Sequence, residues 1–135
     1  MDCPVCHNPM IVLELEMVEI DNCTSCGGIW LDSGELEQLF GDENKANLLI
    51  DSFNPARDVK ENMHSCPICL KKMEKIRTSE SADAVIIDRC AKHHGLWFDK
   101  NELHHLLVTN TLDKEHRIVK LLSEIFAKDN EVRND

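Results

Sequence analysis

Apolar and acidic residues alternate near the start of the chain, from Leu13 to Ile20. A period of two is typical of β-strands that bury one face, so we expect two strands, within residues 11–17 and 18–20, joined as a hairpin. A weaker pattern of the same kind covers residues 73–77 and 84–87. The chain is therefore predicted to contain two separate β-hairpins.

A short helix is predicted after each hairpin. Asp32 and Asp99 are candidate N-caps, and Glu35 and Glu102 follow them at the three-residue spacing of a reciprocal capping box. These signals place helices at residues 34–40 and 100–108. A further short helix is expected at residues 45–51, ahead of a break at Pro55.

The end of the chain carries a different pattern. Over residues 113–128, apolar residues recur at helical spacing on one face, which predicts an amphipathic helix: Ile118, Leu121, Leu122, Ile125 and Phe126. This stripe must be buried on the hairpins, on a second copy of the chain as a homodimer, or on another protein.

The two hairpin regions are copies of one unit. Cys3-Pro4-Val5-Cys6 matches Cys66-Pro67-Ile68-Cys69, and Ile20-Asp21-Asn22-Cys23 matches Ile87-Asp88-Arg89-Cys90. We therefore divide the chain into a first unit (1–41), a linker with a possible short helix (42–63), a second unit (64–108), and a C-terminal helix with its tail (109–135).

Cysteine spacing predicts a metal site in each unit. Two Cys-x-x-Cys pairs separated by 16 residues can aim four thiolates at one point, whereas a lone pair could equally be a redox centre. Seven cysteines fit a four-cysteine site and a three-cysteine, one-histidine site better than disulfides. Met1-Asp2-Cys3 leaves no room for an export signal, so we expect a cytoplasmic protein. The predicted ligands are Cys3, Cys6, Cys23 and Cys26, and Cys66, Cys69, Cys90 and a histidine.

Two neighbouring histidines compete for that last position. His93 lies three residues after Cys90 and four before Trp97, as Cys26 does relative to Cys23 and Trp30. We assign His93 as the ligand and place His94 at the position of Gly27, where the loop needs a positive φ.

The ligand count favours structural over catalytic metal. A catalytic zinc keeps a position open for water, and both predicted sites have four protein ligands. We therefore predict no enzymatic activity and no catalytic residues. Trp30 and Trp97 are expected to pack in the core, with partner binding as the alternative.

Residues 27–36, Gly-Gly-Ile-Trp-Leu-Asp-Ser-Gly-Glu-Leu, together with the Cys-Pro-x-Cys and Ile-Asp-x-Cys motifs, resemble the bacterial TFIIB-type zinc-finger family. The second unit resembles a diverged copy. The resemblance implies a small, metal-stabilised α+β fold of two tandem rubredoxin-like zinc ribbons, each a β-hairpin with a short helix, and two Zn²⁺ ions per chain. It implies little about activity.

The charge distribution bears on the partner. Residues 1–40 carry eight acidic and no basic residues, a formal charge of −8, whereas residues 66–107 carry +1. Nucleic acid should be repelled by the first unit, and no apolar run has the length of a membrane span. We therefore expect a protein-interaction adaptor, with a transcription role as one possibility. The alternatives are nucleic-acid binding through the second unit, and a redox-responsive zinc switch.

Overall fold

The computed structural model describes residues 1–15, 17–40, 43–58, 63–79 and 84–110. Its strands form one antiparallel sheet in the order β1-β2-β3-β7-β6-β5-β4. The strands are β1 (Ile11–Leu15), β2 (Val18–Asn22), β3 (Ile29–Asp32), β4 (Asn54–Pro55), β5 (Glu74–Arg77), β6 (Ile86–Arg89) and β7 (Gly95–Phe98). The helices are α1 (Glu35–Phe40), α2 (Glu43–Asp51) and α3 (Glu102–Asn110).

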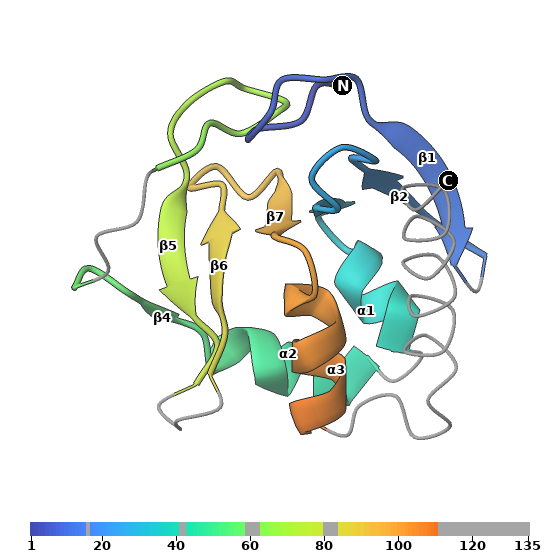
Figure 1. Ribbon diagram of the computed structural model, residues 1–135. Helices are drawn as coiled ribbons and strands as arrows, with labels where there is room; N and C mark the ends of the chain where they lie inside the picture. Colours follow the sequence, from blue (N-terminus) through green and yellow to red (C-terminus); the bar gives the residue numbers. More distant parts are fainter. Residues whose placement is uncertain (16, 41–42, 59–62, 80–83, 111–135) are drawn as a thin grey trace.

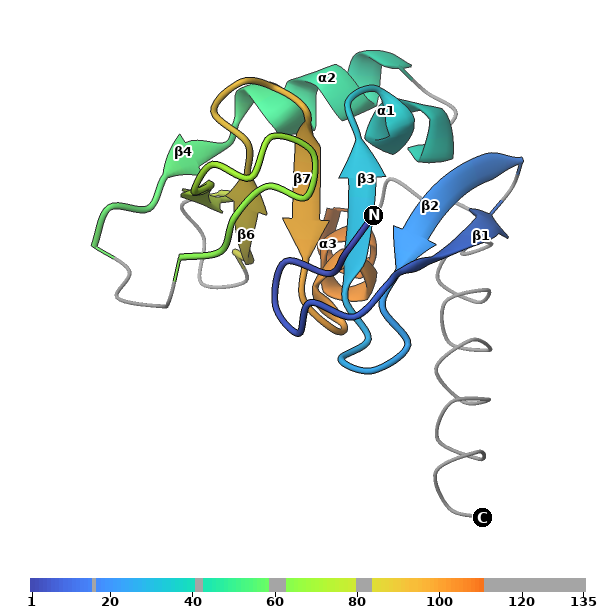
Figure 2. The same cartoon turned by 90° about the horizontal axis from the view of Figure 1, so that it is seen from above.

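Each unit supplies a three-stranded ribbon to this sheet. In the first, β1 pairs with β2 and β2 with β3; in the second, β5, β6 and β7 repeat the arrangement. The ribbons meet where β3 pairs with β7 in the register Ile29↔Phe98, Trp30↔Trp97, Leu31↔Leu96 and Asp32↔Gly95. The two units therefore share one sheet, with β1 at one end and β4, which lies beyond β5, at the other (Figure 2).

Two apolar clusters form because successive strand residues point to opposite faces of the sheet. One cluster contains Leu31 and Phe98 together with Leu36 of α1, Leu49 of α2 and Leu103 of α3. The other contains Trp30, Trp97 and the cysteines. Figure 1 shows the helices gathered at one side of the molecule and the cysteine-bearing loops at the other.

The predicted small α+β architecture is confirmed, with some changes of detail. Both hairpins and the helices of each unit are present, and the helix expected at 45–51 begins at Glu43. Strands β3 and β7 were not predicted, nor was β4, where only a break at Pro55 was expected. The predicted C-terminal helix at 113–128 lies outside the described residues. None of the helices in the described part of the chain is both long and apolar enough to cross a bilayer.

Candidate metal centres

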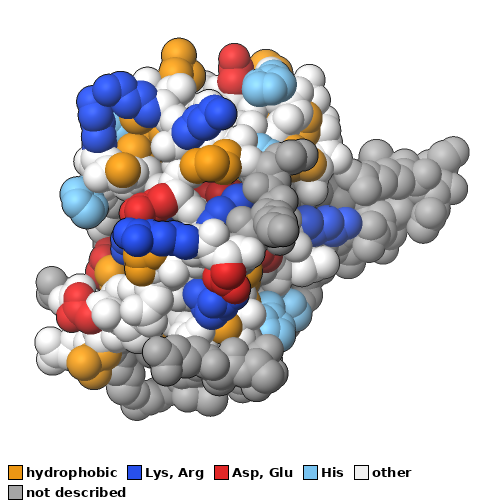
Figure 3. All heavy atoms as spheres, turned by 90° about the vertical axis from the view of Figure 1, so that its left-hand side faces the viewer, with side chains coloured by type: hydrophobic (Ala, Val, Ile, Leu, Met, Phe, Trp, Pro, Cys, Tyr) orange, Lys and Arg blue, Asp and Glu red, His pale blue; other side chains and the backbone are white. Residues whose placement is uncertain are grey.

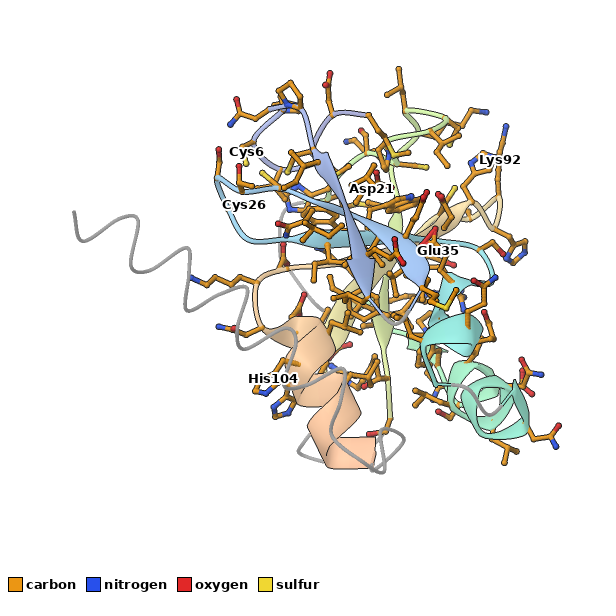
Figure 4. The ribbon with its side chains drawn as sticks, turned by 90° about the vertical axis from the view of Figure 1, so that its right-hand side faces the viewer. Cys6, Asp21, Cys26, Glu35, Lys92 and His104 are labelled. Carbon is orange, nitrogen blue, oxygen red and sulfur yellow. The ribbon has the colours of Figure 1, made fainter. Side chains whose placement is uncertain are left out.

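The first centre is built from two loops that the ribbon brings together. Cys3 and Cys6 lie before β1, and Cys23 and Cys26 lie between β2 and β3. The Sγ of Cys3 lies 3.6 Å from that of Cys6 and 3.7 Å from that of Cys26, and the sulfurs of Cys6 and Cys23 are 3.4 Å apart. Figure 4 shows Cys6 and Cys26 close together at the tips of these loops. All four predicted residues meet at one point.

The second centre repeats this arrangement with one histidine. The Sγ atoms of Cys69 and Cys90 are 3.7 Å apart. The Nδ1 atom of His94 lies 3.5 Å from the Sγ of Cys90 and 3.8 Å from that of Cys66. The prediction of three cysteines and a histidine is therefore correct in composition.

The prediction that the histidine is His93 is wrong, because the structure brings His94 to the thiols. In the loop that begins at Cys23, Gly27 has φ +80° and donates its N–H to the Cys23 carbonyl. In the matching loop of the second unit, His93 has φ +63° and donates its N–H to the Cys90 carbonyl. His93 thus occupies the left-handed turn position and is exposed. The Nδ1 atom of a histidine lies one bond farther from the backbone than the sulfur of a cysteine does. His94, the residue after this turn position, can therefore reach the three thiols.

Both clusters fit a tetrahedral metal ion. In each group of four residues the donor atoms lie within 4.8 Å of one another. A tetrahedron with metal–sulfur bonds of about 2.3 Å has edges of about 3.8 Å, close to the observed sulfur–sulfur distances of 3.4 to 3.7 Å. Four thiolates, as in the first unit, and three thiolates with one imidazole, as in the second, are donor sets that zinc prefers. These residues could hold one metal ion in each unit.

Neighbouring groups shift the pKa values of the thiols in opposite directions. The backbone N–H of Lys71 helps lower the pKa of Cys69 to about 6, whereas burial raises the pKa of Cys66 to about 11. Burial also raises the pKa of Cys26. For Cys23, burial is outweighed by hydrogen bonds from the Cys26 backbone and the Cys6 thiol, and its pKa falls to about 7. Four clustered thiols repel each other as anions, and a divalent cation relieves this repulsion.

Backbone N–H groups turn toward the cysteine that begins each loop. The N–H groups of Val5 and Cys6 point to the Sγ of Cys3 at 3.3 and 3.4 Å, and the N–H of Ile68 points to the Sγ of Cys66 at 3.4 Å. These contacts hold the backbone of each turn around its first sulfur. The tight Cys-Pro-x-Cys turn therefore aims both of its sulfurs at one point.

The tryptophans pack beside the metal centres, as predicted, and both are 0% exposed. Their ring nitrogens donate to aspartates two residues later, Trp30 to Asp32 at 2.8 Å and Trp97 to Asp99 at 3.0 Å. Each aspartate therefore fixes an indole ring, a role that the sequence analysis missed. The sequence spacing could have revealed this role, because side chains two residues apart in a strand point to the same face of the sheet.

The capping-box prediction is confirmed in the second unit, where the N–H of Asp99 donates to Glu102 Oε1 at 2.7 Å. In the first unit the Asp32 backbone likewise bonds the Glu35 carboxyl. Burial and the nearby Asp32 carboxyl raise the pKa of Glu35 to about 8. The Asp21 carboxyl adds to this rise, and its own pKa is also raised by burial and by Asp32.

Comparison with known protein families finds a match to the transcription factor zinc-finger family over residues 2–41 and again over residues 65–109. No curated protein and no solved structure matches the chain. The two matched stretches coincide with the two units and include every cysteine and His94. The chain belongs to this family and carries two tandem copies of its zinc finger.

Proposed function

We propose that this member of the transcription factor zinc-finger family is a non-enzymatic protein that holds two structural zinc ions and serves as a protein-interaction adaptor in transcription. The observation that carries the proposal is that each centre has four protein ligands: four thiols in the first, and three thiols and a histidine in the second. Four protein ligands complete the tetrahedron of a structural zinc and leave no position for substrate or water.

Burial of the ligands supports the structural role. Cys3, Cys23, Cys66 and Cys90 are at most 2% exposed and belong to the same cluster as both tryptophans. Loss of the ion would leave this core without its central bonds, since zinc supplies folding free energy in small fingers. The metal is thus suited to hold the sheet in shape, and the outer surface is left for recognition.

Exposed apolar side chains support the adaptor role. Ile68 is 46% exposed and Leu70 75% exposed at the Cys66–Cys69 turn of the second unit. Met17 is 89% exposed at the turn of the first hairpin. Exposed apolar residues mark sites of protein contact where they form a contiguous patch, and Ile68 and Leu70 lie two residues apart on one loop. The acidic first unit would select a partner with basic or neutral surface.

Cross-linking of the zinc-loaded chain in a lysate of its source cell, read by mass spectrometry, tests this function. We expect reproducible cross-links to one component of the transcription machinery, and we expect chelation of the metal to abolish them. Cross-links to no protein, or measurable turnover of a substrate by the zinc-loaded chain, would overturn the proposal.

Nucleic-acid binding is the second candidate, and three lysines favour it. Lys71, Lys72 and Lys92 are exposed on the cysteine loops of the second unit, and Figure 3 shows basic side chains on the face that this unit presents. Three other basic residues of the second unit are engaged in ion pairs: Lys75 with Asp88, Arg77 with Asp58 and Arg89 with Glu74.

A filter-binding titration with the zinc-loaded chain at low salt decides this second candidate, because the phosphate contribution to affinity is largest there. Retention of DNA or RNA at micromolar protein that falls steeply with salt would support it. Absence of retention at low salt would remove it.

A further inference from the structure

The outer edge of the second ribbon carries an added strand. Residues of β4 pair antiparallel with β5, Asn54 opposite Arg77 and Pro55 opposite Ile76. The N–H of Ala56 then donates to the Lys75 carbonyl at 2.9 Å. The edge of a ribbon in this fold therefore accepts one more extended segment.

An ion pair fastens that segment. The guanidinium of Arg77 lies against the Asp58 carboxylate, with Nη2 to Oδ2 at 3.2 Å and Nη1 to Oδ1 at 3.5 Å. Because both nitrogens face both oxygens, the contact is of the two-pronged type that gives arginine pairs their geometric specificity. The charged residue on the edge strand thus selects the opposite charge on the added segment.

Strand β1 is the counterpart of β5 in the first ribbon, and the two align by strand register. Leu13 lies opposite Ile20 as Ile76 lies opposite Ile87, and Glu14 takes the position of Arg77. No strand lies beyond β1 among the residues that the structure describes, and Figure 2 shows it at the end of the sheet opposite β4. Among the described residues, no strand takes the place on β1 that β4 takes on β5.

Apart from the charge of Glu14, the sequence of β1 lacks the features that protect an edge strand from pairing. Edge strands are usually kept short or marked by lysine or proline. The opposite edge strand, β4, has two residues and ends in Pro55, whereas β1 has five residues and no lysine or proline. On β1, Val12 is 61% exposed and Ile11 45% exposed. The length and exposed apolar residues of β1 therefore favour pairing with another strand.

The charge beside this edge indicates the chemistry of the partner. The exposed Glu14 lies directly opposite the exposed Glu19, an arrangement of like charges that costs free energy unless a cation is near. Residues 1–40 contain no lysine or arginine to supply one. Pairing with β1 of a second copy would bring more acidic side chains together, so it is disfavoured.

We propose that the outer edge of β1 binds an extended basic segment of another protein, which pairs antiparallel along Leu13 and Glu14 and places a lysine or arginine against Glu14. The segment occupies the place on the first ribbon that β4 occupies on the second, with the charges of Arg77 and Asp58 exchanged. This inference rests on the proposed adaptor function and gives that adaptor a class of partner.

Two peptides test the proposal by a titration of the ¹⁵N-labelled, zinc-loaded full chain followed by NMR. One is the acetylated and amidated segment 52–58, and the other is the same segment with Asp58→Lys. We expect saturable shifts of the amide signals of residues 11–15, with about threefold tighter binding of the lysine peptide, the size of one exposed ion pair.

A charge exchange on the chain provides the decisive comparison. The Glu14→Arg chain should bind the Asp58 peptide better than the lysine peptide, whereas the control Asp51→Arg, at the exposed end of α2, should keep the native preference. An unchanged signal dispersion shows that each variant is folded.

Several outcomes overturn the proposal: no saturable shift in residues 11–15, equal affinity for both peptides, an unchanged preference in Glu14→Arg, or self-association of the chain through β1. A cross-linked transcription partner that contacts another surface would leave the proposed function standing and would overturn this inference alone.

Discussion

Trp30 and Trp97 are paired directly across the β3–β7 junction, and each indole ring packs against the glycine of the other unit. A Cβ atom on Gly28 would lie 2.1 Å from Cζ2 of Trp97, and one on Gly95 would lie 2.7 Å from Cζ2 of Trp30. The loop of each metal centre is thus closed by the tryptophan of the other, and the two units form one core.

Replacement of Gly28 by alanine tests this exchange of tryptophans. The added methyl group would displace the ring of Trp97, and overpacking of this kind costs about 3 kcal/mol of unfolding free energy. The matched control is Gly34→Ala, where the nearest atom is 4.0 Å away and only the backbone φ of +94° is unfavourable, a cost of about 1 kcal/mol. Urea unfolding of the zinc-loaded proteins measures both, and equal costs would contradict the packing.

Loss of one metal centre should weaken the other. In Cys23→Ser the first centre loses a ligand, and because Trp30 packs on Gly95, next to His94, the second centre loses part of its support. We expect less than two zinc ions per chain and a lower zinc affinity at the second site, measured by competition with a zinc-binding dye. The exposed Ala91→Ser in the second loop is the control. A Cys23→Ser chain with two zinc ions and a native spectrum would contradict the assignment.

The second ribbon contains a buried ion pair that the first lacks. Lys75 Nζ lies 2.8 Å from Asp88 Oδ1, and their side chains are 7% and 2% exposed. Val12 and Asp21 occupy the same register in the first ribbon. The Lys75→Val variant would leave the Asp88 carboxylate buried without its cation, at a cost of about 3 kcal/mol.

Chemical denaturation checks this cost, and the double variant Lys75→Val with Asp88→Asn should recover much of it because no charge is left buried. A loss below about 1 kcal/mol for the single variant, typical of an exposed pair, would contradict a buried role for this lysine.

Glu35 should make stability depend on pH. Its pKa is raised from 4.5 to about 8 by burial and by the Asp32 carboxyl, so the folded chain holds a proton that the unfolded chain releases. The stability that protonated Glu35 contributes is fully present below pH 4.5 and is lost as the pH rises toward 8 and above. The unfolding free energy of the native chain should therefore fall more than that of Glu35→Gln.

Urea unfolding of both proteins between pH 6 and 9, in zinc-buffered solution, measures this difference. Comparison with the glutamine variant removes the pH dependence that metal binding adds to both. Parallel pH profiles would show that Glu35 is ionised in the folded chain as it is in the unfolded one.

Much of the candidate site could be predicted from the sequence because metal geometry limits the spacing of its ligands. The Cys-x-x-Cys turns and the alternation in β1 and β2 carry local signals that need no tertiary information. Seven of the eight predicted ligands lie where expected. The eighth was misplaced because the φ of His93 and the reach of the His94 ring depend on how the loop turns.

The junction of the two units could not be predicted in the same way. Ile29-Trp30-Leu31 and Leu96-Trp97-Phe98 are short apolar runs that are covered on both faces, so no alternation marks them as strands. Their pairing depends on a contact between distant parts of the chain. The glycines gave a signal only in retrospect, since a Cβ is excluded at Gly28 by Trp97 and at Gly95 by the Leu31 carbonyl together with Trp30.

The zinc content of two histidine variants tests the central claim most directly. We predict that the native chain and His93→Ala each retain two zinc ions per chain under mild chelation, as measured by mass spectrometry of the metal, because His93 is exposed at the turn and His94 lies among the thiols. His94→Ala should retain one. Two zinc ions in His94→Ala together with one in His93→Ala would contradict the account.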